Sequence, residues 1–162
     1  MNKEKSICLI TVVVLIIDQI IKLCILHFMD LYQRIIIIPH LFSLFFVKNT
    51  GAAFSILENY NFLFIGISIG FLINMFLYIR KEENNSSLFR WTLGILLGGV
   101  LGNLLDRIFY QSVIDYLSFE FFQYSFPVFN FADACISVGV CLFILHMICQ
   151  QKENKVSDDS KV

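Results

Sequence analysis

Four long apolar runs follow one another along the chain, separated by stretches that mix polar and aromatic residues. They cover residues 7–29, 60–79, 88–105 and 129–149. Each is close to the roughly 20 residues with which a helix crosses about 30 Å of hydrocarbon. The pattern therefore predicts four transmembrane helices.

The connections after the first and third runs are not ordinary polar loops. Residues 35–38 and 41–47 are β-branched and aromatic, which is typical of short strands, and residues 118–129 are rich in Phe and Tyr. We expect these segments to rest on the membrane surface, where aromatic rings are favoured. They either only anchor the helices or also shape a binding surface.

Composition supports the membrane class. The chain has 162 residues, of which 57% are hydrophobic and 15% charged, with a formal net charge of −1. Soluble domains have about 45–50% apolar and about 25% charged residues. Such a chain is too hydrophobic to be disordered and lacks the cationic surface of a nucleic-acid binder, so no nucleic-acid partner is expected.

Basic residues predict the orientation of the helices. One set flanks the two termini and the middle connection: Lys3, Lys5, Arg80, Lys81, Arg90, Lys152, Lys155 and Lys161. The other two connections hold only Arg34, Lys48 and Arg107. The positive-inside rule then puts both termini in the cytoplasm and residues 30–59 and 106–127 outside.

These patterns together predict an all-α membrane protein with four transmembrane helices and a small extracytoplasmic segment that contains β-structure. We expect a single membrane-embedded domain over residues 1–152 and a disordered cytoplasmic tail over residues 153–162. The five cysteines show no C-x-x-C pair and the three histidines no ligand-like spacing. The sequence thus predicts no disulfide, no metal site and no cofactor.

Asp18 lies inside the first predicted helix, about 16 Å from its start at about 1.5 Å per residue. A carboxylate at that depth is costly and needs a partner within the protein. Lys22 is one turn further on the same helix face. The pair either pins the helices together or takes part in chemistry.

Three more aspartates are expected to meet at the outer end of the bundle, namely Asp106, Asp115 and Asp133. Asn103 and Asn130 each precede one of them by three residues, and each can offer an amide to a carboxylate or to a substrate backbone. The aspartates either cap helices and pair with Arg107, or two of them share a proton. Such a pair can activate water for attack on an amide, as in aspartic proteases.

Five short blocks of sequence stand out along the chain. They are Asp18-Gln19-x-x-Lys22, Asn49-Thr50-Gly51-Ala52-Ala53-Phe54, Gly98-Gly99-x-x-Gly102-Asn103-x-x-Asp106-Arg107, Val113-Ile114-Asp115-Tyr116 and Phe129-Asn130-Phe131-Ala132-Asp133. Together they resemble the lipoprotein signal peptidase (signal peptidase II) family of bacterial intramembrane aspartic proteases. They occur in the family's order across nearly the whole chain. Tyr116 stands where Phe is usual, and Ile114 where Val is common.

The resemblance implies that Asp115 and Asp133 are the catalytic pair. It implies supporting or substrate-positioning roles for Asp18, Lys22, Asn49, Gly51, Asn103, Asp106, Arg107 and Asn130. The implied substrates are prolipoproteins whose cysteine carries diacylglycerol, cut just before that cysteine.

The implied location is the bacterial cytoplasmic (inner) membrane, where the protein would be a monomer surrounded by lipid with its active site near the outer leaflet. A small proton-coupled transporter is the alternative, since membrane carboxylates often relay protons. A transporter should show inverted repeats, and the sequence has none. A non-catalytic scaffold would leave three aspartates without a purpose.

Overall fold

The computed structural model describes residues 2–51, 60–83, 86–122 and 124–159, with side chains described up to residue 150. Four helices dominate it: α1 (Lys3–Phe28), α2 (Asn61–Lys81), α3 (Ser87–Tyr110) and α4 (Phe131–Asp159). Within the described ranges these four are long and apolar enough to cross a membrane. The prediction of four transmembrane helices is confirmed.

Helix α3 is the centre of the bundle and packs against each of the other three helices. Small residues allow this close approach. A Cβ at Gly98 would lie 2.6 Å from the Cβ of Val14 on α1, and one at Gly99 would lie 2.6 Å from the carbonyl oxygen of Ala132 on α4. By contrast, only 6% of the most apolar window of α2 is buried, which leaves most of that helix to contact lipid.

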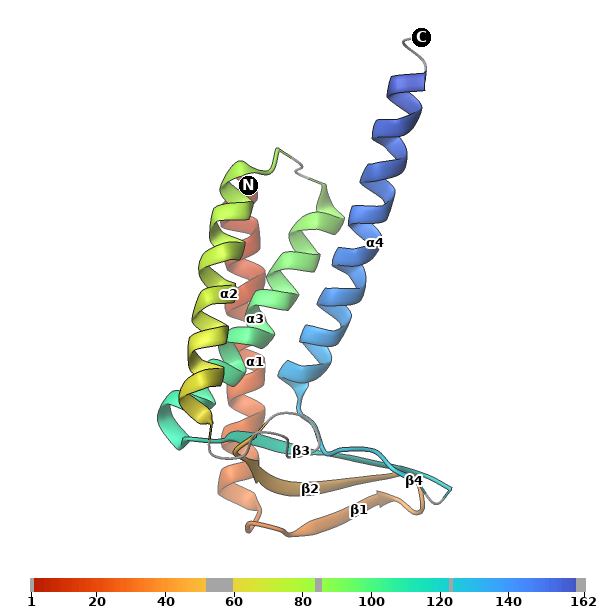
Figure 1. Cartoon of the computed structure of the whole chain (residues 1–162). Helices are drawn as coiled ribbons and strands as arrows, with labels where there is room; N and C mark the ends of the chain where they lie inside the picture. Colours follow the sequence, from red (N-terminus) through yellow and green to blue (C-terminus); the bar gives the residue numbers. More distant parts are fainter. Residues whose placement is uncertain (1, 52–59, 84–85, 123, 160–162) are drawn as a thin grey trace.

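A four-stranded antiparallel sheet lies across one end of the bundle (Figure 1). Its strands, in spatial and chain order, are β1 (Arg34–Ile38), β2 (Phe42–Asn49), β3 (Val113–Phe121) and β4 (Tyr124–Ser125). The first two match the predicted strands closely, whereas β3 was not predicted. Its pairing with β2 sets Asp115 opposite Val47.

Two clusters of buried apolar side chains stabilise the two ends of the molecule. At the sheet end, Ile25 of α1 and Met29 directly after that helix pack with Phe46 of β2 and with Ile114 and Tyr116 of β3. This cluster fixes β3 against the end of α1, and so positions Asp115 relative to the helices.

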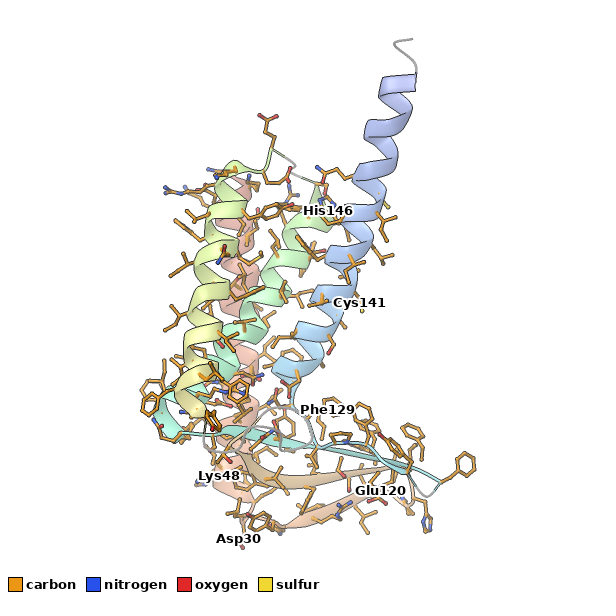
Figure 2. All side chains as sticks on the ribbon, viewed as in Figure 1. Asp30, Lys48, Glu120, Phe129, Cys141 and His146 are labelled. Atoms are coloured by element: carbon orange, nitrogen blue, oxygen red, sulfur yellow. The ribbon has the colours of Figure 1, made fainter. Side chains whose placement is uncertain are left out.

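The second cluster joins the ends of the helices away from the sheet: Ile7, Ile79, Phe89 and Leu93. In Figure 2, His146 and Cys141 lie along α4 above the sheet, while Asp30, Lys48 and Glu120 lie at the sheet end. The five cysteines are free.

Helix α4 continues to Asp159, into the segment for which the sequence predicts a disordered tail. That segment contains Glu153 and Lys155, which are good helix formers. The domain boundary at residue 152 stays a prediction. Part of the block Asn49–Phe54, namely Ala52, Ala53 and Phe54, lies outside the described residues.

Candidate active site

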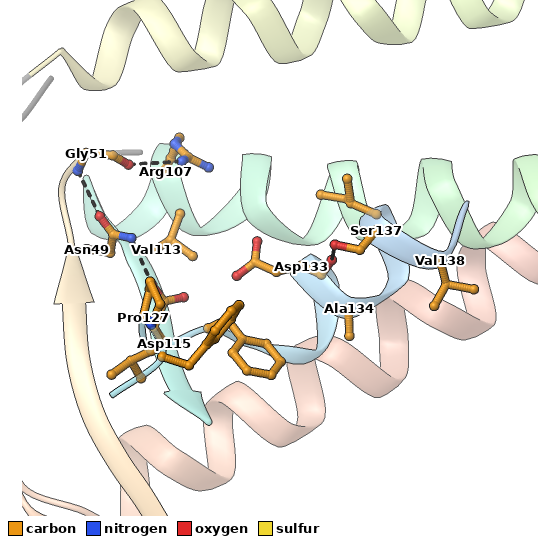
Figure 3. Close-up of a pocket in the computed structure, with 14 residues that line it drawn as sticks. Asn49, Gly51, Arg107, Val113, Asp115, Pro127, Asp133, Ala134, Ser137 and Val138 are labelled. Carbon is orange, nitrogen blue, oxygen red and sulfur yellow. Dashed lines mark hydrogen bonds between the residues drawn. The ribbon is translucent and has the colours of Figure 1, made fainter. Parts of the chain in front are cut away.

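A cavity of about 650 Å³ opens between the sheet and the start of α4 (Figure 3). Its lining comes from β2, β3, α3, α4 and the segment that leads into α4, and comprises Asn49, Gly51, Arg107, Val113, Asp115, Phe126, Pro127, Val128, Phe129, Asp133, Ala134, Ile136, Ser137 and Val138. Asp115 and Asp133 both line it. Two carboxylates that the chain separates by a strand and a connection therefore share one cavity.

Asp115 is 2% exposed and is held by two asparagine amides. Asn49 Nδ2 donates to its Oδ2 at 2.9 Å, and Asn130 Nδ2 donates to its Oδ1 at 2.7 Å. Burial and, after it, the nearby Asp133 carboxylate raise the pKa of Asp115 to about 7, against the lowering effect of the two amides. Asp115 is therefore poised to exchange a proton near neutral pH.

Asp133 lies in the first turn of α4 and is partly buried. The Asn130 backbone N–H donates to its Oδ2 at 3.1 Å, while the Asp133 backbone N–H donates to Asn130 Oδ1 at 2.9 Å. This reciprocal pair is a capping box. One of the roles that the sequence left open, helix capping, thus belongs to Asp133, which also faces the cavity.

Asn103 and Asn130 connect the two carboxylates. Asn103 Nδ2 donates to Asp133 Oδ1 at 2.7 Å, and Asn130 Nδ2 also donates to Asn103 Oδ1 at 3.1 Å. Of the two uses that the sequence left open for these amides, a carboxylate or a substrate backbone, both asparagines show the contact with a carboxylate. The partner of Asn103 is Asp133 on another helix, although its nearest aspartate in the chain is Asp106.

Behind the asparagines lies a buried ion cluster that joins α1 to α3. The Lys22 ammonium contacts Asp18 Oδ2 and Asp106 Oδ2, both at 2.8 Å, and donates to Asn103 Oδ1 at 3.1 Å. All three charged side chains are at most 1% exposed. Asp106 therefore faces Lys22 on the bundle side, and the predicted Asp18–Lys22 pair becomes a triad.

The ion cluster also fixes the two elements that carry the cavity carboxylates. Asp18 Oδ1 accepts a hydrogen bond from the Ala132 N–H at the start of α4, at 3.1 Å. Asp106 Oδ2 accepts one from the Ile114 N–H of β3, at 3.1 Å. Ala132 directly precedes Asp133, and Ile114 directly precedes Asp115. The ion cluster therefore fixes the backbone next to each cavity carboxylate.

Arg107 borders the cavity at the end of α3. Its guanidinium donates to the carbonyl oxygens of Asn103 and Gly51, at 3.4 and 3.5 Å, and its Cζ lies 5.1 Å from the centre of the Phe64 ring. The sequence left open a pairing of Arg107 with an aspartate. The observed nitrogen contacts are to backbone carbonyls, and Arg107 thereby joins α3 to the segment after β2.

Two contributing side chains were not predicted. Gln19 Nε2 donates to Asp18, to Asp106 and to the Gly102 carbonyl, at 3.1–3.3 Å. Its place in the Asp18-Gln19-x-x-Lys22 block was the available signal. The Tyr116 hydroxyl accepts the Phe131 N–H at 3.2 Å, and the available signal was the departure from the family's usual Phe, which adds that hydroxyl.

Known proteins match this chain over most of its length. The family model for "Signal peptidase (SPase) II" matches residues 10–149. The lipoprotein signal peptidase of Symbiobacterium thermophilum is 38% identical over 89% of this chain and 95% of its own length. That of Anoxybacillus flavithermus is 36% identical over 93% of this chain and 90% of its own length.

Solved structures of two bacterial membrane enzymes, obtained by the in meso method, have the same fold. One has a TM-score of 0.84 at 32% identity, with 93% of this chain and 91% of its own covered. The other has a TM-score of 0.79 at 33% identity, with 89% and 92% covered.

The fold and the matches define a multi-pass membrane peptidase of the aspartic type. The chain belongs to the signal peptidase II family, and its activity is that of a lipoprotein signal peptidase. This result favours the peptidase over the transporter and the scaffold that the sequence left as alternatives.

Proposed function

We propose that Asp115 and Asp133 are the catalytic pair of this peptidase. The observation that carries the proposal is their shared cavity, in which each carboxylate is held by an asparagine amide. The pKa of Asp115, raised to about 7 by burial and the neighbouring Asp133, supports it. Two close carboxylates do not both ionise readily, so the pair retains one proton near neutral pH.

The shared proton divides the chemical work between the two side chains. The ionised carboxylate takes a proton from water as the water oxygen attacks the scissile carbonyl carbon. The protonated carboxylic acid donates a hydrogen bond to the carbonyl oxygen and stabilises the charge that develops there. When the C–N bond breaks, the leaving amine takes a proton from the pair, which returns to its starting state.

The other polar residues position this pair. Asn49, Asn103 and Asn130 orient the carboxylates, and Arg107 holds the Gly51 carbonyl at the cavity wall. The triad behind them is a scaffold made of three residues: Asp18, Lys22 and Asp106. We assign no contact with the reacting atoms to that triad.

The substrates we propose are prolipoproteins that carry diacylglycerol on a cysteine, cut at the amide just before that cysteine. The cavity walls support this choice, because Phe126, Val128 and Ile136 supply apolar surface beside the two carboxylates. Lipid chains can remain in the bilayer while the signal-peptide helix packs along the spans. The peptidase would act as a monomer in lipid.

We also propose that the protein lies in the bacterial cytoplasmic membrane with both termini in the cytoplasm. The support is the distribution of basic residues: Lys3, Lys5, Arg80, Lys81 and Arg90 all belong to the end of the bundle away from the sheet. The sheet and the cavity would then face the outer leaflet.

A cleavage assay with the purified protein tests the substrate proposal. A peptide spanning a signal sequence and a diacylglyceryl-modified cysteine should be cut, and mass spectrometry should find the new N-terminus at that cysteine. The matched control is the same peptide with an unmodified cysteine, which should be cut far more slowly. Equal cleavage of both peptides, or cleavage elsewhere, would contradict the proposal.

A further inference from the structure

The buried residues of helix α2 are Asn61 and Ile79, near its two ends. Asn61 is the first residue of the helix and is 7% exposed. A buried amide on a helix that mostly faces lipid is costly unless it has hydrogen-bond partners. The partners of Asn61 lead directly to Arg107, which borders the carboxylate cavity.

The Asn61 amide fixes the backbone at the end of α3. Its Nδ2 donates to the Arg107 carbonyl oxygen at 3.0 Å and to Gln111 Oε1 at 2.9 Å. The last four carbonyl groups of a helix have no partner within it, and that of Arg107 is one of them, because α3 ends at Tyr110. Asn61 therefore holds the point from which the Arg107 side chain starts.

Phe64 holds the other end of the same side chain. It lies three residues after Asn61, on the same face of α2, and its ring centre is 5.1 Å from Arg107 Cζ. That distance is within the roughly 6 Å of a cation–π contact. The guanidinium's own hydrogen bonds, at 3.4 and 3.5 Å, are longer than the usual range of about 2.7–3.2 Å. The ring therefore contributes to the orientation of the guanidinium.

The cavity offers Arg107 other partners. The carboxylates whose charges act on its guanidinium are, in decreasing order, Asp133, Asp115 and Asp106. Asp106 is already paired with Lys22 at 2.8 Å. Arg107 nevertheless contacts backbone carbonyls, and in Figure 3 its side chain lies apart from both cavity carboxylates.

We infer that Asn61 and Phe64 are positioning residues, which hold Arg107 at the cavity wall and keep its guanidinium from pairing with a catalytic carboxylate. The inference rests on the catalytic pair proposed above. An ion pair in the cavity would favour the ionised form of the carboxyl group and so the loss of the proton that the pair shares. The pair would then lack the acid that the mechanism needs.

The pH profile of cleavage tests the role of Phe64. Phe64→Leu removes the ring and keeps an apolar side chain, so the released guanidinium should pair with a cavity carboxylate. The alkaline limb of the profile for the diacylglyceryl peptide should then move to lower pH by about one pH unit, a modest effect for an arginine beside a carboxylate. Phe64→Tyr keeps a ring and should keep the profile of the parent.

Asn61→Ala should move the profile in the same direction, because the end of α3 loses both contacts with the amide. The chain offers a matched control for each position on the same helix. Phe62 is 80% exposed, so Phe62→Leu should leave the profile unchanged. The Asn74 amide also donates to a carbonyl, that of Gly70 at 2.8 Å, so Asn74→Ala should do the same.

Thermal unfolding provides a readout that does not need activity. Burial of the Asp115 carboxyl makes the folded protein less stable as the pH rises towards about 7. In Phe64→Leu and Asn61→Ala this decrease should level off about one pH unit earlier, because the guanidinium favours the ionised form.

Two results would overturn the inference and leave the catalytic pair in place. One is slower cleavage or lower stability in Phe64→Leu and Asn61→Ala with both pH dependences unmoved, which would show that the two residues only stabilise the fold. The other is an equal shift in the control variants Phe62→Leu and Asn74→Ala. Cleavage at the parent rate by Asp115→Asn would instead contradict the catalytic pair itself.

Discussion

Asp115 lies in surroundings where a carboxyl group loses its proton only at a higher pH than usual. It is enclosed by β2, the start of α4 and the cavity wall, and burial raises its pKa to about 7 against an ordinary value of 3.8. Both of its oxygens accept hydrogen bonds from asparagine amides, so the side chain keeps one orientation in either protonation state. A single residue thus combines a fixed position with a proton that it can exchange.

The raised pKa predicts a pH dependence of stability. Between pH 4 and 7 the folded protein keeps the Asp115 proton, whereas the unfolded chain, with a pKa near 3.8, has released it. The free energy of unfolding therefore falls as the pH rises through this window and levels off above it. In Asp115→Asn this part of the pH dependence should disappear, measured as the midpoint of thermal unfolding in detergent at each pH.

Asp30→Asn is the control for that series, because Asp30 is an exposed carboxylate at the sheet end. It should follow the unmodified protein across the whole range. An Asp115→Asn variant that loses as much stability as the unmodified protein between pH 4 and 7 would contradict the assigned pKa.

At the scale of the elements, α1 and α3 are joined by charge and by close backbone contact at the same level. The ammonium of Lys22 on α1 lies between carboxylates of both helices. One turn before Asp106, Gly102 leaves room for Asp18, since a Cβ there would lie 2.3 Å from Asp18 Oδ2. The two features depend on each other, because the cluster closes only if the helices approach.

Removing the cation should destabilise the bundle strongly. Lys22→Met leaves Asp18 and Asp106 buried beside each other without a positive charge, and breaking a buried ion pair this way costs about 3–5 kcal/mol. We expect loss of folded protein in detergent, measured by thermal unfolding and size-exclusion chromatography. Lys48→Met, at an exposed position of β2, should unfold like the parent. Parent-like stability of Lys22→Met would show that the triad contributes little.

The close approach predicts a second effect at this scale. Gly102→Ala pushes a methyl group into the Asp18 carboxylate, so the helices must separate and both stability and cleavage should fall sharply. Gly70→Ala on α2 is the matched control, because nothing lies within 4 Å of its added Cβ. It should be neutral or slightly stabilising, since Ala is the better helix former. Equal behaviour of the two variants in a thermal unfolding assay would contradict the packing described.

At the scale of the whole molecule, the sheet lies at one end of the bundle and the start of α1 and the end of α4 lie at the other (Figure 1). The proposed orientation makes this asymmetry testable. In a variant without native cysteines, a cysteine at His40 should react in intact cells with a thiol reagent that cannot cross the cytoplasmic membrane. One at Lys81 should react only after the membrane is opened. The opposite pattern would reverse the topology.

The helices could be predicted from sequence because the bilayer imposes a length and an apolar character on each span. Strand β3 was not predicted, although Val113 and Ile114 at its start are β-branched. The strand forms through pairing with β2, a contact between residues far apart in the chain. Sequence spacing does not record such pairing.

The site shows the same limit. Spacing suggested that Asp106, Asp115 and Asp133 would meet, and only the packing separates Asp106, which faces Lys22, from the two that line the cavity. The sequence likewise could not predict that Asn103 binds Asp133, since this contact depends on how α3 packs against α4. The choice of Asp115 and Asp133 as the proposed pair came from the resemblance to the family. The contacts that support this choice, a shared cavity and the asparagine amides, come from the tertiary structure.

Cleavage by single carboxamide variants tests the catalytic pair most directly. Asp115→Asn and Asp133→Asn each keep one of the two oxygen acceptors and the shape of the side chain, so both should still fold and insert, with a moderate loss of thermal stability from the lost acceptor. Each should nevertheless lose cleavage of the diacylglyceryl peptide, by about a thousandfold or more, because an amide neither takes nor gives the proton. Cleavage at the parent rate by either folded variant would contradict the assignment of Asp115 and Asp133 as the catalytic pair.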